Sequence, residues 1–81
     1  MTEVVLYGKA GCHLCEEARA EVEAVRARRP FSLREIDITA DPVLYARYGE
    51  RIPVLLVAGE EAFEYHVDRA ELTRLLDTVT G

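Results

Sequence analysis

The apolar residues of this chain fall into short runs and stripes whose spacing predicts alternating strands and helices. Residues 3–7 form an apolar run with β-branched and aromatic side chains, which is typical of a buried strand. Residues 12–28 instead place apolar side chains three and four positions apart, as one face of a helix requires. The members of this stripe are Cys15, Ala18, Val22 and Val25. Pro30 ends the helix, because proline cannot continue helical hydrogen bonding.

The middle of the chain predicts a second strand and a short helix. The strand covers residues 31–38, where β-branched and apolar residues recur. The helix covers residues 42–48, because Asp41 is a good capping residue and Pro42 suits the first helical position. Gly49 marks the end of this helix.

The last third of the chain predicts a hairpin and a final helix. A strand over residues 54–57, a turn over residues 58–61 and a return strand over residues 62–65 form the hairpin. Asp68 and Glu71 resemble a capping box, with Asp in place of Ser or Thr. The apolar residues of the amphipathic helix that follows are Leu72, Leu75, Leu76 and Val79.

The predicted order is β-α-β-α-β-β-α, an α/β fold with one mixed four-stranded sheet flanked by helices. The helical crossover between the first two strands makes them parallel, and the short turn makes the last two antiparallel. We expect a single domain over residues 1–81, because this length without a Gly-, Ser- or Pro-rich linker leaves room for one compact core.

Composition narrows the class of protein. Hydrophobic residues make up 49% and charged residues 31% of the chain, as in globular proteins rather than disordered or membrane-embedded ones. The longest apolar run, residues 54–58, is too short to cross a bilayer. No basic leader with an apolar segment precedes residue 4, so we expect a cytoplasmic location.

The charge balance disfavours anionic partners. The net charge of −5 repels phosphate backbones and anionic lipids, so we expect that the protein binds neither nucleic acid nor membranes. We also expect it to be a monomer. The basic cluster of Arg26, Arg28 and Arg29 lies at the predicted end of the first helix, where cations complement the helix dipole.

The candidate chemistry lies in a C-x-x-C motif, formed by Cys12 and Cys15, between the first strand and the first helix. The free N–H groups and the dipole at a helix start favour an anion, so a thiol there ionises more easily. The second sulfur follows one turn later on the same face and can reach the first. In a chain of this kind the pair indicates a redox dithiol or a metal site, rather than a secreted disulfide framework.

Two motifs together carry a family resemblance. Residues 7–15, with the sequence Tyr-Gly-Lys-Ala-Gly-Cys-His-Leu-Cys, are similar to the glutaredoxin stretch in which tyrosine, a small residue and lysine precede the active dithiol. Ile52 and Pro53 fall where the superfamily carries an apolar residue and a cis-proline. Over nearly its whole length the chain resembles a glutaredoxin-like member of the thioredoxin-fold superfamily, which implies thioredoxin-like architecture and thiol–disulfide oxidoreductase activity.

The resemblance assigns roles to the two cysteines. Cys12 is expected to attack a disulfide and form a mixed disulfide, which Cys15 then resolves. Lys9 and His13 are expected to support the Cys12 thiolate, while Glu16 and its neighbour Glu17 oppose it. We therefore expect the pKa of Cys12 to lie modestly below the ~8.5 of an ordinary cysteine.

The resemblance also implies how substrates and co-substrates bind. A cis Ile52–Pro53 bond would face the dithiol and leave the backbone of Ile52 free to pair with an extended substrate. Glutathione is a possible co-substrate and no bound cofactor is expected, but typical glutaredoxins carry Pro-Tyr between the cysteines and a Gly-Gly pair followed by Asp before the last helix. This chain has His-Leu between the cysteines and Tyr65, His66 and Val67 ahead of Asp68. A protein disulfide is therefore an alternative partner, with a thioredoxin-type or glutathione-based reductant.

Two other classes of function are compatible with the sequence. Cys12 and Cys15 could supply half of a metal or iron–sulfur site, with a second chain or glutathione supplying the rest. The domain could also serve as an interaction module in which the dithiol is incidental. His66 is interpreted as an ordinary polar residue at the end of the fourth strand.

Overall fold

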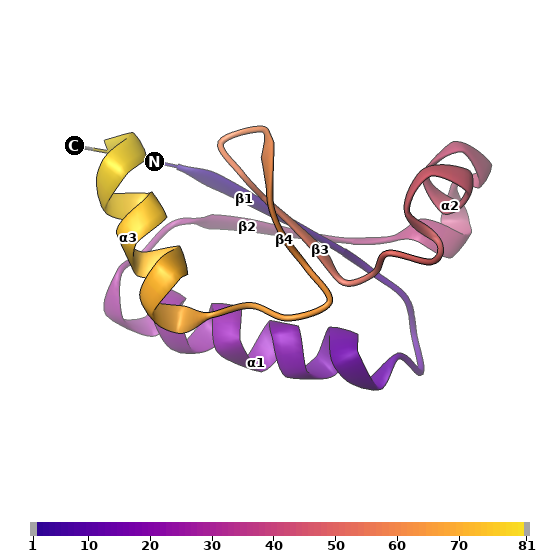
Figure 1. Cartoon of the computed structure of the whole chain (residues 1–81), viewed down its shortest axis with the longest axis horizontal. Helices are drawn as coiled ribbons and strands as arrows, with labels where there is room; N and C mark the ends of the chain where they lie inside the picture. The colour runs from indigo at the N-terminus through magenta and orange to yellow at the C-terminus, as the bar shows by residue number, and fades with distance from the viewer. Residues whose placement is uncertain (1, 81) are drawn as a thin grey trace.

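The computed structural model describes residues 2–80, and its elements follow the predicted order with one additional 3₁₀ turn (Figure 1). The elements are β1 (Glu3–Gly8), α1 (His13–Arg28), β2 (Ser32–Asp37), η1 (Ile38–Ala40), α2 (Pro42–Tyr48), β3 (Val54–Val57), β4 (Glu60–Glu64) and α3 (Arg69–Thr80). Within the described residues no helix is long and apolar enough to cross a membrane.

The strands form one mixed sheet in the order β2-β1-β3-β4. β1 and β2 run parallel, whereas β1 with β3 and β3 with β4 run antiparallel. This topology confirms the predicted four-stranded mixed sheet. The parallel pair is joined through α1, as a helical crossover requires.

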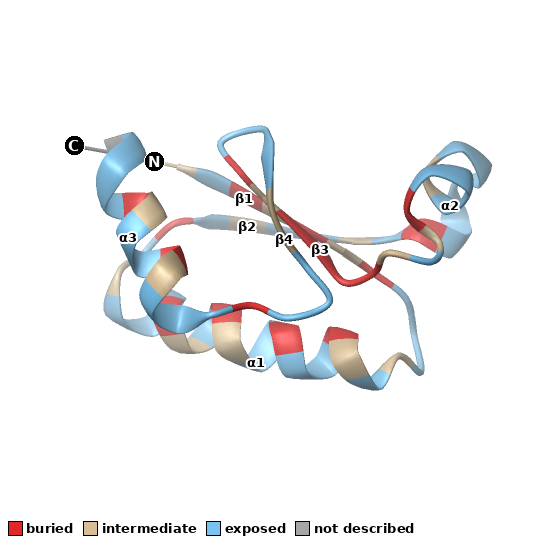
Figure 2. Ribbon diagram, in the orientation of Figure 1, coloured by how far each residue is buried: buried red, intermediate tan, exposed pale blue. Residues whose placement is uncertain are grey.

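The main core lies between one face of the sheet and the helices α1 and α3. Val4 and Leu6 alternate along β1 and are buried, and Leu72 and Leu76 of α3 pack in the same cluster. All four residues of the predicted α1 stripe are buried. Figure 2 shows the buried positions of α1 and α3 turned toward the sheet. Removing this much apolar surface from water is the main stabilising contribution to the fold.

A second apolar cluster occupies the end of the sheet near the start of α1. It comprises Cys15, Ile38, Tyr48, Ile52 and Val54, with Tyr7, Cys12, Leu44 and Leu56 packed against them. α2 and η1 contribute to this cluster, and Figure 1 places α2 at the opposite end of the molecule from the termini. Helices therefore flank both faces of the sheet, but α2 covers only one end of its face.

The predicted strand over residues 31–38 is too long at both ends. β2 ends at Asp37, and Ile38 begins η1 with its side chain fully buried. The carboxylate of Asp37 accepts a hydrogen bond from Thr39 N–H at 2.8 Å, so a local capping turn replaces the strand ladder. β2 is an edge strand in which Leu33 and Ile36 are only half-buried. Their spacing of three residues places them on opposite faces of the sheet, which explains the irregular apolar pattern of this strand.

The predicted hairpin turn over residues 58–61 is too long. Only Ala58 and Gly59 form the turn, with φ of 53° and 86°, and β4 already begins at Glu60. A two-residue hairpin turn requires positive φ at both positions, and this geometry sets the start of the return strand. β4 ends at Glu64, so the predicted strand over 62–65 is also shifted.

The helix signals were largely correct. α2 has its predicted bounds, and the Asp41 carboxylate accepts from Val43 N–H at 2.9 Å. Asp68 caps α3 by accepting from Ala70 N–H at 2.9 Å. The predicted capping box forms only in that half, because the Glu71 carboxylate accepts from Arg74 Nε at 3.1 Å instead.

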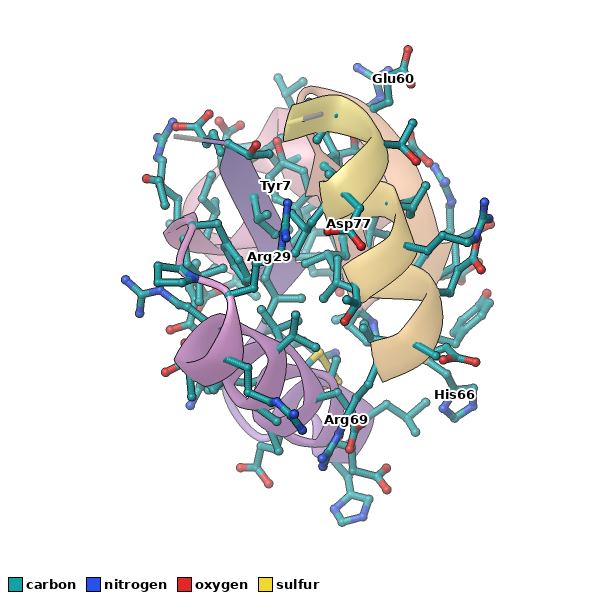
Figure 3. All side chains as sticks on the ribbon, turned by 90° about the vertical axis from the view of Figure 1, so that its left-hand side faces the viewer. Tyr7, Arg29, Glu60, His66, Arg69 and Asp77 are labelled. Carbon is teal, nitrogen blue, oxygen red and sulfur yellow. A yellow bond between two sulfur atoms is a disulfide. The ribbon has the colours of Figure 1, made fainter. Side chains whose placement is uncertain are left out.

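The end of α3 differs from the prediction at Val79, and the end of α1 makes contacts that the sequence did not predict. Val79 was predicted on the packed face of α3, but 47% of its surface is exposed. The arginines at the end of α1 contact neighbouring residues in addition to complementing the helix dipole. Arg29 Nη1 lies 2.6 Å from Asp77 Oδ1 of α3 (Figure 3), and Arg26 Nε donates to the carbonyl of Phe31 at 3.1 Å.

Candidate active site

Cys12 and Cys15 lie where the chain passes from β1 into α1. Their Cα atoms are 5.2 Å apart and their sulfurs form a disulfide. Cys12 is the N-cap of α1, one position before the first turn in which it was predicted, and its extended backbone has φ −93° and ψ 112°. Gly11 turns the chain into the helix with φ of 75°, a conformation that favours glycine.

The two sulfurs have different surroundings. Cys12 is half-buried, whereas Cys15 is only 7% exposed and packs in the second cluster. The Cys12 Sγ accepts a hydrogen bond from the backbone N–H of Cys15 at 3.2 Å. A donor at this distance, at the positive end of a helix dipole, favours a negatively charged sulfur. The arrangement therefore leaves the residue Cys12 more exposed than the residue Cys15.

Gly8 makes room for the sulfur of Cys15. A Cβ at this position would lie 3.1 Å from Cys15 Sγ and 3.2 Å from Cys15 Cβ, closer than side chains normally approach. The last residue of β1 therefore has to be small for α1 to approach the strand. The sequence analysis used Gly8 only as part of a motif and did not identify this contact.

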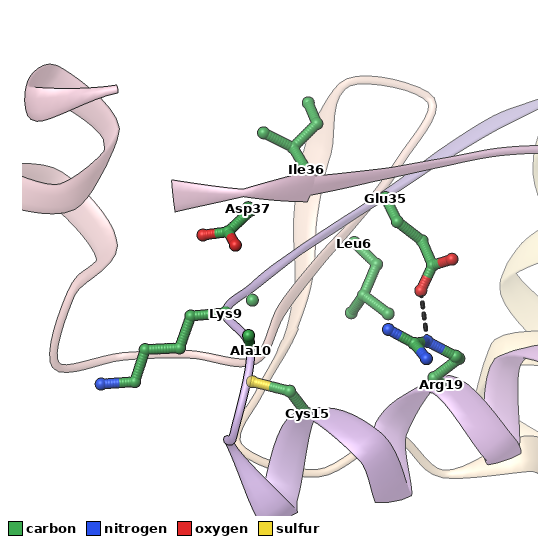
Figure 4. Close-up of a pocket in the computed structure, with 9 residues that line it drawn as sticks. Leu6, Lys9, Ala10, Cys15, Arg19, Glu35, Ile36 and Asp37 are labelled. Atoms are coloured by element: carbon green, nitrogen blue, oxygen red, sulfur yellow. Dashed lines mark hydrogen bonds and ion pairs between the residues drawn. The ribbon is translucent and has the colours of Figure 1, made fainter. Parts of the chain in front are cut away.

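A hollow of about 240 Å³ lies on the β2 side of Cys15 (Figure 4). Arg19 and Glu35 face each other across part of it, with Arg19 Nε 2.5 Å from Glu35 Oε1. Asp37 stands at its rim. Hydrogen bonds from the Thr39 hydroxyl and N–H, and a weaker one from Ala10 N–H, hold the pKa of Asp37 below its usual value despite partial desolvation. Asp37 thus connects the end of β2 to the loop that precedes Cys12.

Lys9 and His13 lie on the surface around the dithiol. The Lys9 side chain lines the hollow but extends away from Cys15 in Figure 4. The side chain of His13 is 85% exposed, and its Nε2 lies 3.7 Å from the carboxylate of Glu17. Support of the Cys12 thiolate by these two residues stays a prediction.

The Ile52–Pro53 peptide bond is cis, as predicted. Ile52 belongs to the same apolar cluster as Cys15, and Cys12 packs against that cluster, so the segment lies close to the dithiol. Tyr65 N–H donates to the carbonyl of Pro53 at 2.8 Å. Within residues 2–80 the backbone of Ile52 makes no hydrogen bond.

Two aromatic residues also pack near the site: Tyr7, which the sequence analysis used only as part of the motif, and Tyr48, which it did not select as a site residue. The rings of Tyr7 and Tyr48 are stacked, with centroids 4.6 Å apart and planes at 17°. Both belong to or pack against the cluster that contains Cys15. Their contact joins β1 to α2, which are far apart in sequence, so no local signal could have identified it.

The segment between β4 and α3 carries side chains in place of glycines. Tyr65 has φ of 66° and an exposed ring, and His66 is exposed beyond the end of β4 rather than inside it. With Glu17 and Glu21 of α1 they line a shallow hollow of about 220 Å³. Among residues 2–80 no three His, Cys, Asp or Glu side chains gather closely enough to hold a metal ion.

Comparisons with known proteins agree with this architecture. An uncharacterized protein of Mycobacterium tuberculosis is 31% identical over 81 aligned positions, which cover 89% of this chain and 84% of that protein. The crystal structure of protein XcR50 from X. campestris superposes with a TM-score of 0.77 at 30% identity, covering 93% of this chain and 96% of that one.

The wider fold is that of thioredoxin. A thioredoxin mutant from Halobacterium salinarum superposes with a TM-score of 0.73 at 22% identity, covering 99% of this chain and 75% of that one. This likeness establishes the predicted thioredoxin-like fold. The model of the family described as "Glutaredoxin-like domain (DUF836)" matches residues 3–77, and the chain belongs to that family.

Proposed function

We propose that this protein is a thiol–disulfide oxidoreductase in which Cys12 is the nucleophile and Cys15 is the resolving cysteine. The observation that carries this proposal is the difference between the two sulfurs. Cys12 is half-buried and accepts an N–H bond at the start of α1, while Cys15 is shielded within bonding reach of it. Attack on a substrate requires an accessible thiolate, and resolution requires a second thiol close to the first.

The reaction transfers two electrons from the dithiol to the substrate. The Cys12 thiolate attacks one sulfur of the substrate disulfide, the substrate S–S bond breaks, and the departing thiolate takes up a proton. Cys15 then loses its proton to solvent and attacks Cys12 Sγ, which releases the second substrate thiolate. The product is the Cys12–Cys15 disulfide, the state that the structure describes. A thiol reductant returns this disulfide to the dithiol.

An extended substrate segment would pair with the backbone of Ile52. Two observations support this part of the proposal: Ile52 lies in the cluster that contains Cys15, and its backbone makes no hydrogen bond within the described residues. Backbone pairing aligns a peptide without reading its side chains, as in other cases of strand addition. Bringing the substrate disulfide to Cys12 in this way converts an encounter into a positioned reaction.

The favoured substrate class is a protein disulfide rather than a glutathione disulfide. In typical glutaredoxins the glutamyl end of glutathione binds the segment before the last helix, where this chain has Tyr65 and His66. The adjoining hollow is lined by the carboxylates of Glu17 and Glu21. Glu17 adds negative charge that repels the carboxylates of glutathione, whereas Glu21 is already paired with Arg69, and the side chains of Tyr65 and His66 hinder a close backbone approach.

Single-cysteine variants test the assignment. We expect reduced Cys15→Ser to form one stable mixed disulfide with a peptide disulfide, because Cys12 attacks but no resolving thiol remains. We expect Cys12→Ser to react at least about tenfold more slowly, because its remaining thiol is shielded. Intact-mass spectrometry against time measures both products.

The same assay distinguishes the substrates and can overturn the proposal. The wild type should oxidise to its internal disulfide about tenfold faster with the peptide disulfide than with glutathione disulfide. Equal trapping by the two single-cysteine variants would show that the roles are misassigned. A reduced wild type that reacts with neither disulfide would end the proposal.

A further inference from the structure

The segment that precedes β3, residues 50–53, is fastened to β4 and to the residue after it. Arg51 Nε donates to Glu64 Oε2 at 2.8 Å, and Arg51 Nη2 also contacts the carboxylate of Glu61. The Tyr65 hydroxyl donates to the carbonyl of Glu50 at 3.0 Å. With the bond from Tyr65 N–H to the carbonyl of Pro53, the segment is held at three of its four residues. Ile52 is the residue left without such a contact.

Arg51 also contacts the aromatic pair on the other side of the site. Its guanidinium carbon lies 5.4 Å from the ring centroid of Tyr48, which is within the range of a cation–π contact. Tyr48 is buried and stacks on Tyr7, which directly precedes Gly8 and the loop to Cys12. One guanidinium therefore connects β4, the segment before β3 and Tyr48 at the end of α2.

The contribution of Arg51 to stability is expected to be small. The side chains of Arg51, Glu61 and Glu64 are 35%, 35% and 45% exposed, and exposed ion pairs contribute little to the free energy of unfolding. The fork of the guanidinium nevertheless fixes direction, because its N–H groups reach two carboxylates at once. Such a contact serves geometry more than stability.

We propose that Arg51 is a positioning residue that orients the backbone of Ile52 and thereby raises the reactivity of the dithiol toward extended peptide disulfides relative to small disulfides. This inference rests on the proposed function. A small disulfide needs only access to Cys12, whereas a peptide disulfide also uses the backbone of Ile52. Loosening residues 50–53 therefore affects the second class of substrate far more than the first.

The test compares two disulfides with the same leaving group. One is 2-hydroxyethyl disulfide, and the other is a nine-residue alanine peptide whose central cysteine carries the same mercaptoethanol group. We expect Arg51→Met to lower the ratio of the peptide rate constant to the small-disulfide rate constant about tenfold, because misplacement on the ångström scale slows positioned reactions strongly. Stopped-flow fluorescence or quenched mass spectrometry of the reduced protein gives both rate constants.

Matched variants separate positioning from a general loss of structure. Arg74→Met removes another exposed arginine, which pairs with Glu71 on α3, and should leave the ratio unchanged. Arg51→Lys keeps the charge but cannot bridge two carboxylates in the same way, so the ratio should fall to an intermediate value. Tyr65→Phe removes only the hydroxyl bond to Glu50 and should also lower the ratio, which keeps the test available if Arg51→Met does not fold.

The outcomes distinguish this inference from the proposed function. A wild type that reacts with neither disulfide overturns the proposed function and this inference with it. A wild type that reacts with both, together with unchanged ratios in Arg51→Met and Tyr65→Phe, overturns the positioning role alone. Equal losses on both disulfides would also overturn it, because they would assign Arg51 to the dithiol or the fold. A peptide N-methylated on both sides of its cysteine should show no dependence on Arg51.

Discussion

Cys12 and Cys15 differ in their surroundings because one turn of helix separates an N-cap position from a packed position. Cys12 is the N-cap, where the chain leaves the loop and the sulfur meets an N–H donor. Cys15 lies on the stripe of α1 that faces the sheet and is buried with it. For this pair the sequence was sufficient to bring the sulfurs together, since a spacing of three residues at a helix start places both on one side.

The close contact between Gly8 and Cys15 gives the first prediction. Gly8→Ala should destabilise the protein by about 1–3 kcal/mol, because the new methyl group crowds a packed sulfur. The Cβ would lie 3.1 Å from Cys15 Sγ, so Cys15 or the strand has to shift. Urea denaturation of the oxidised protein measures the change in the free energy of unfolding.

A double-mutant cycle is the control for this contact. In a Cys15→Ala background the sulfur is absent, so the cost of Gly8→Ala should shrink. An equal cost in both backgrounds would mean that the effect of Gly8→Ala comes from the strand rather than from the sulfur.

Residue-scale contacts between distant segments were beyond the sequence analysis. Gly8 was recognised only as a small residue in a motif, and Tyr48 only as the last residue of a helix. Their importance comes from what they touch, which is Cys15 for Gly8 and Tyr7 for Tyr48. The fold brings these partners together, so no spacing along the chain encodes them.

At the scale of elements, a boundary could be predicted where the sequence carries residues that favour helix ends or turns. α2 has its predicted bounds because Asp41, Pro42 and Gly49 mark its ends. The turn after β3 was misjudged because Ala58 is not a residue that usually adopts positive φ. Similarly, the apolar Ile38 resembles a strand residue but is turned into the core by the cap at Asp37.

The unusual conformation of Ala58 gives the second prediction. Ala58→Asn should stabilise the protein by about 0.5–1 kcal/mol, because asparagine tolerates positive φ better than alanine does. The φ of Ala58 is 53° in a two-residue turn with Gly59, where Asn-Gly is the favoured pair. Thermal and urea denaturation measure the gain.

Ala46 of α2 is a control of opposite sign. It is exposed and helical, so Ala46→Gly should destabilise by about 1 kcal/mol. A loss of stability in Ala58→Asn would show that the turn does not have the geometry described.

The packing of α3 gives the third prediction. Leu72→Ala should cost about 2–5 kcal/mol, because it leaves a cavity under a fully buried side chain. Leu72 has no exposed surface and shares the main cluster with β1 and α1. Val79→Ala is the control on the exposed side of the same helix. Urea denaturation of the two variants and the wild type measures the loss in free energy of unfolding at each position. A similar cost at the two positions would contradict the assigned face of α3.

At the scale of the whole molecule, connection lengths predicted the orientation of two strand pairs, and the full topology assembles the site. The helical crossover makes β1 and β2 parallel, the two-residue turn makes β3 and β4 antiparallel, and the longer connection through η1 and α2 brings β3 antiparallel to β1. The end of β1 and the start of β3 therefore meet at one edge of the sheet, where the dithiol and Ile52 lie together. The family resemblance implied that the Ile52–Pro53 segment faces the dithiol, whereas the pairing of β1 with β3 and the contacts of Arg51 required the structure.

The distribution of ion pairs over the molecule gives the last prediction. The pKa values of Glu21, Glu71 and Asp37 are lowered, mainly by hydrogen bonds from Arg69, Arg74 and Thr39 respectively. A carboxylate whose pKa is lower in the folded state binds fewer protons there than in the unfolded state, so acid favours unfolding. This stabilisation is fully present above the ordinary values of 4.5 for Glu and 3.8 for Asp and is lost as the pH falls through the lower folded values.

A triple variant, Glu21→Gln with Asp37→Asn and Glu71→Gln, removes these three carboxylates and changes the net charge from −5 to −2, which relaxes self-repulsion and opposes the expected loss of stability. The variant should be less stable than the wild type at pH 7, and the gap should narrow as the pH falls below 4.5. Urea denaturation at a series of pH values gives the comparison. Because the pairs are exposed, about 0.5 M salt should narrow the gap at pH 7 as well. If the difference in free energy of unfolding between the wild type and the variant does not depend on pH, these carboxylates stabilise the fold through packing rather than through their charge.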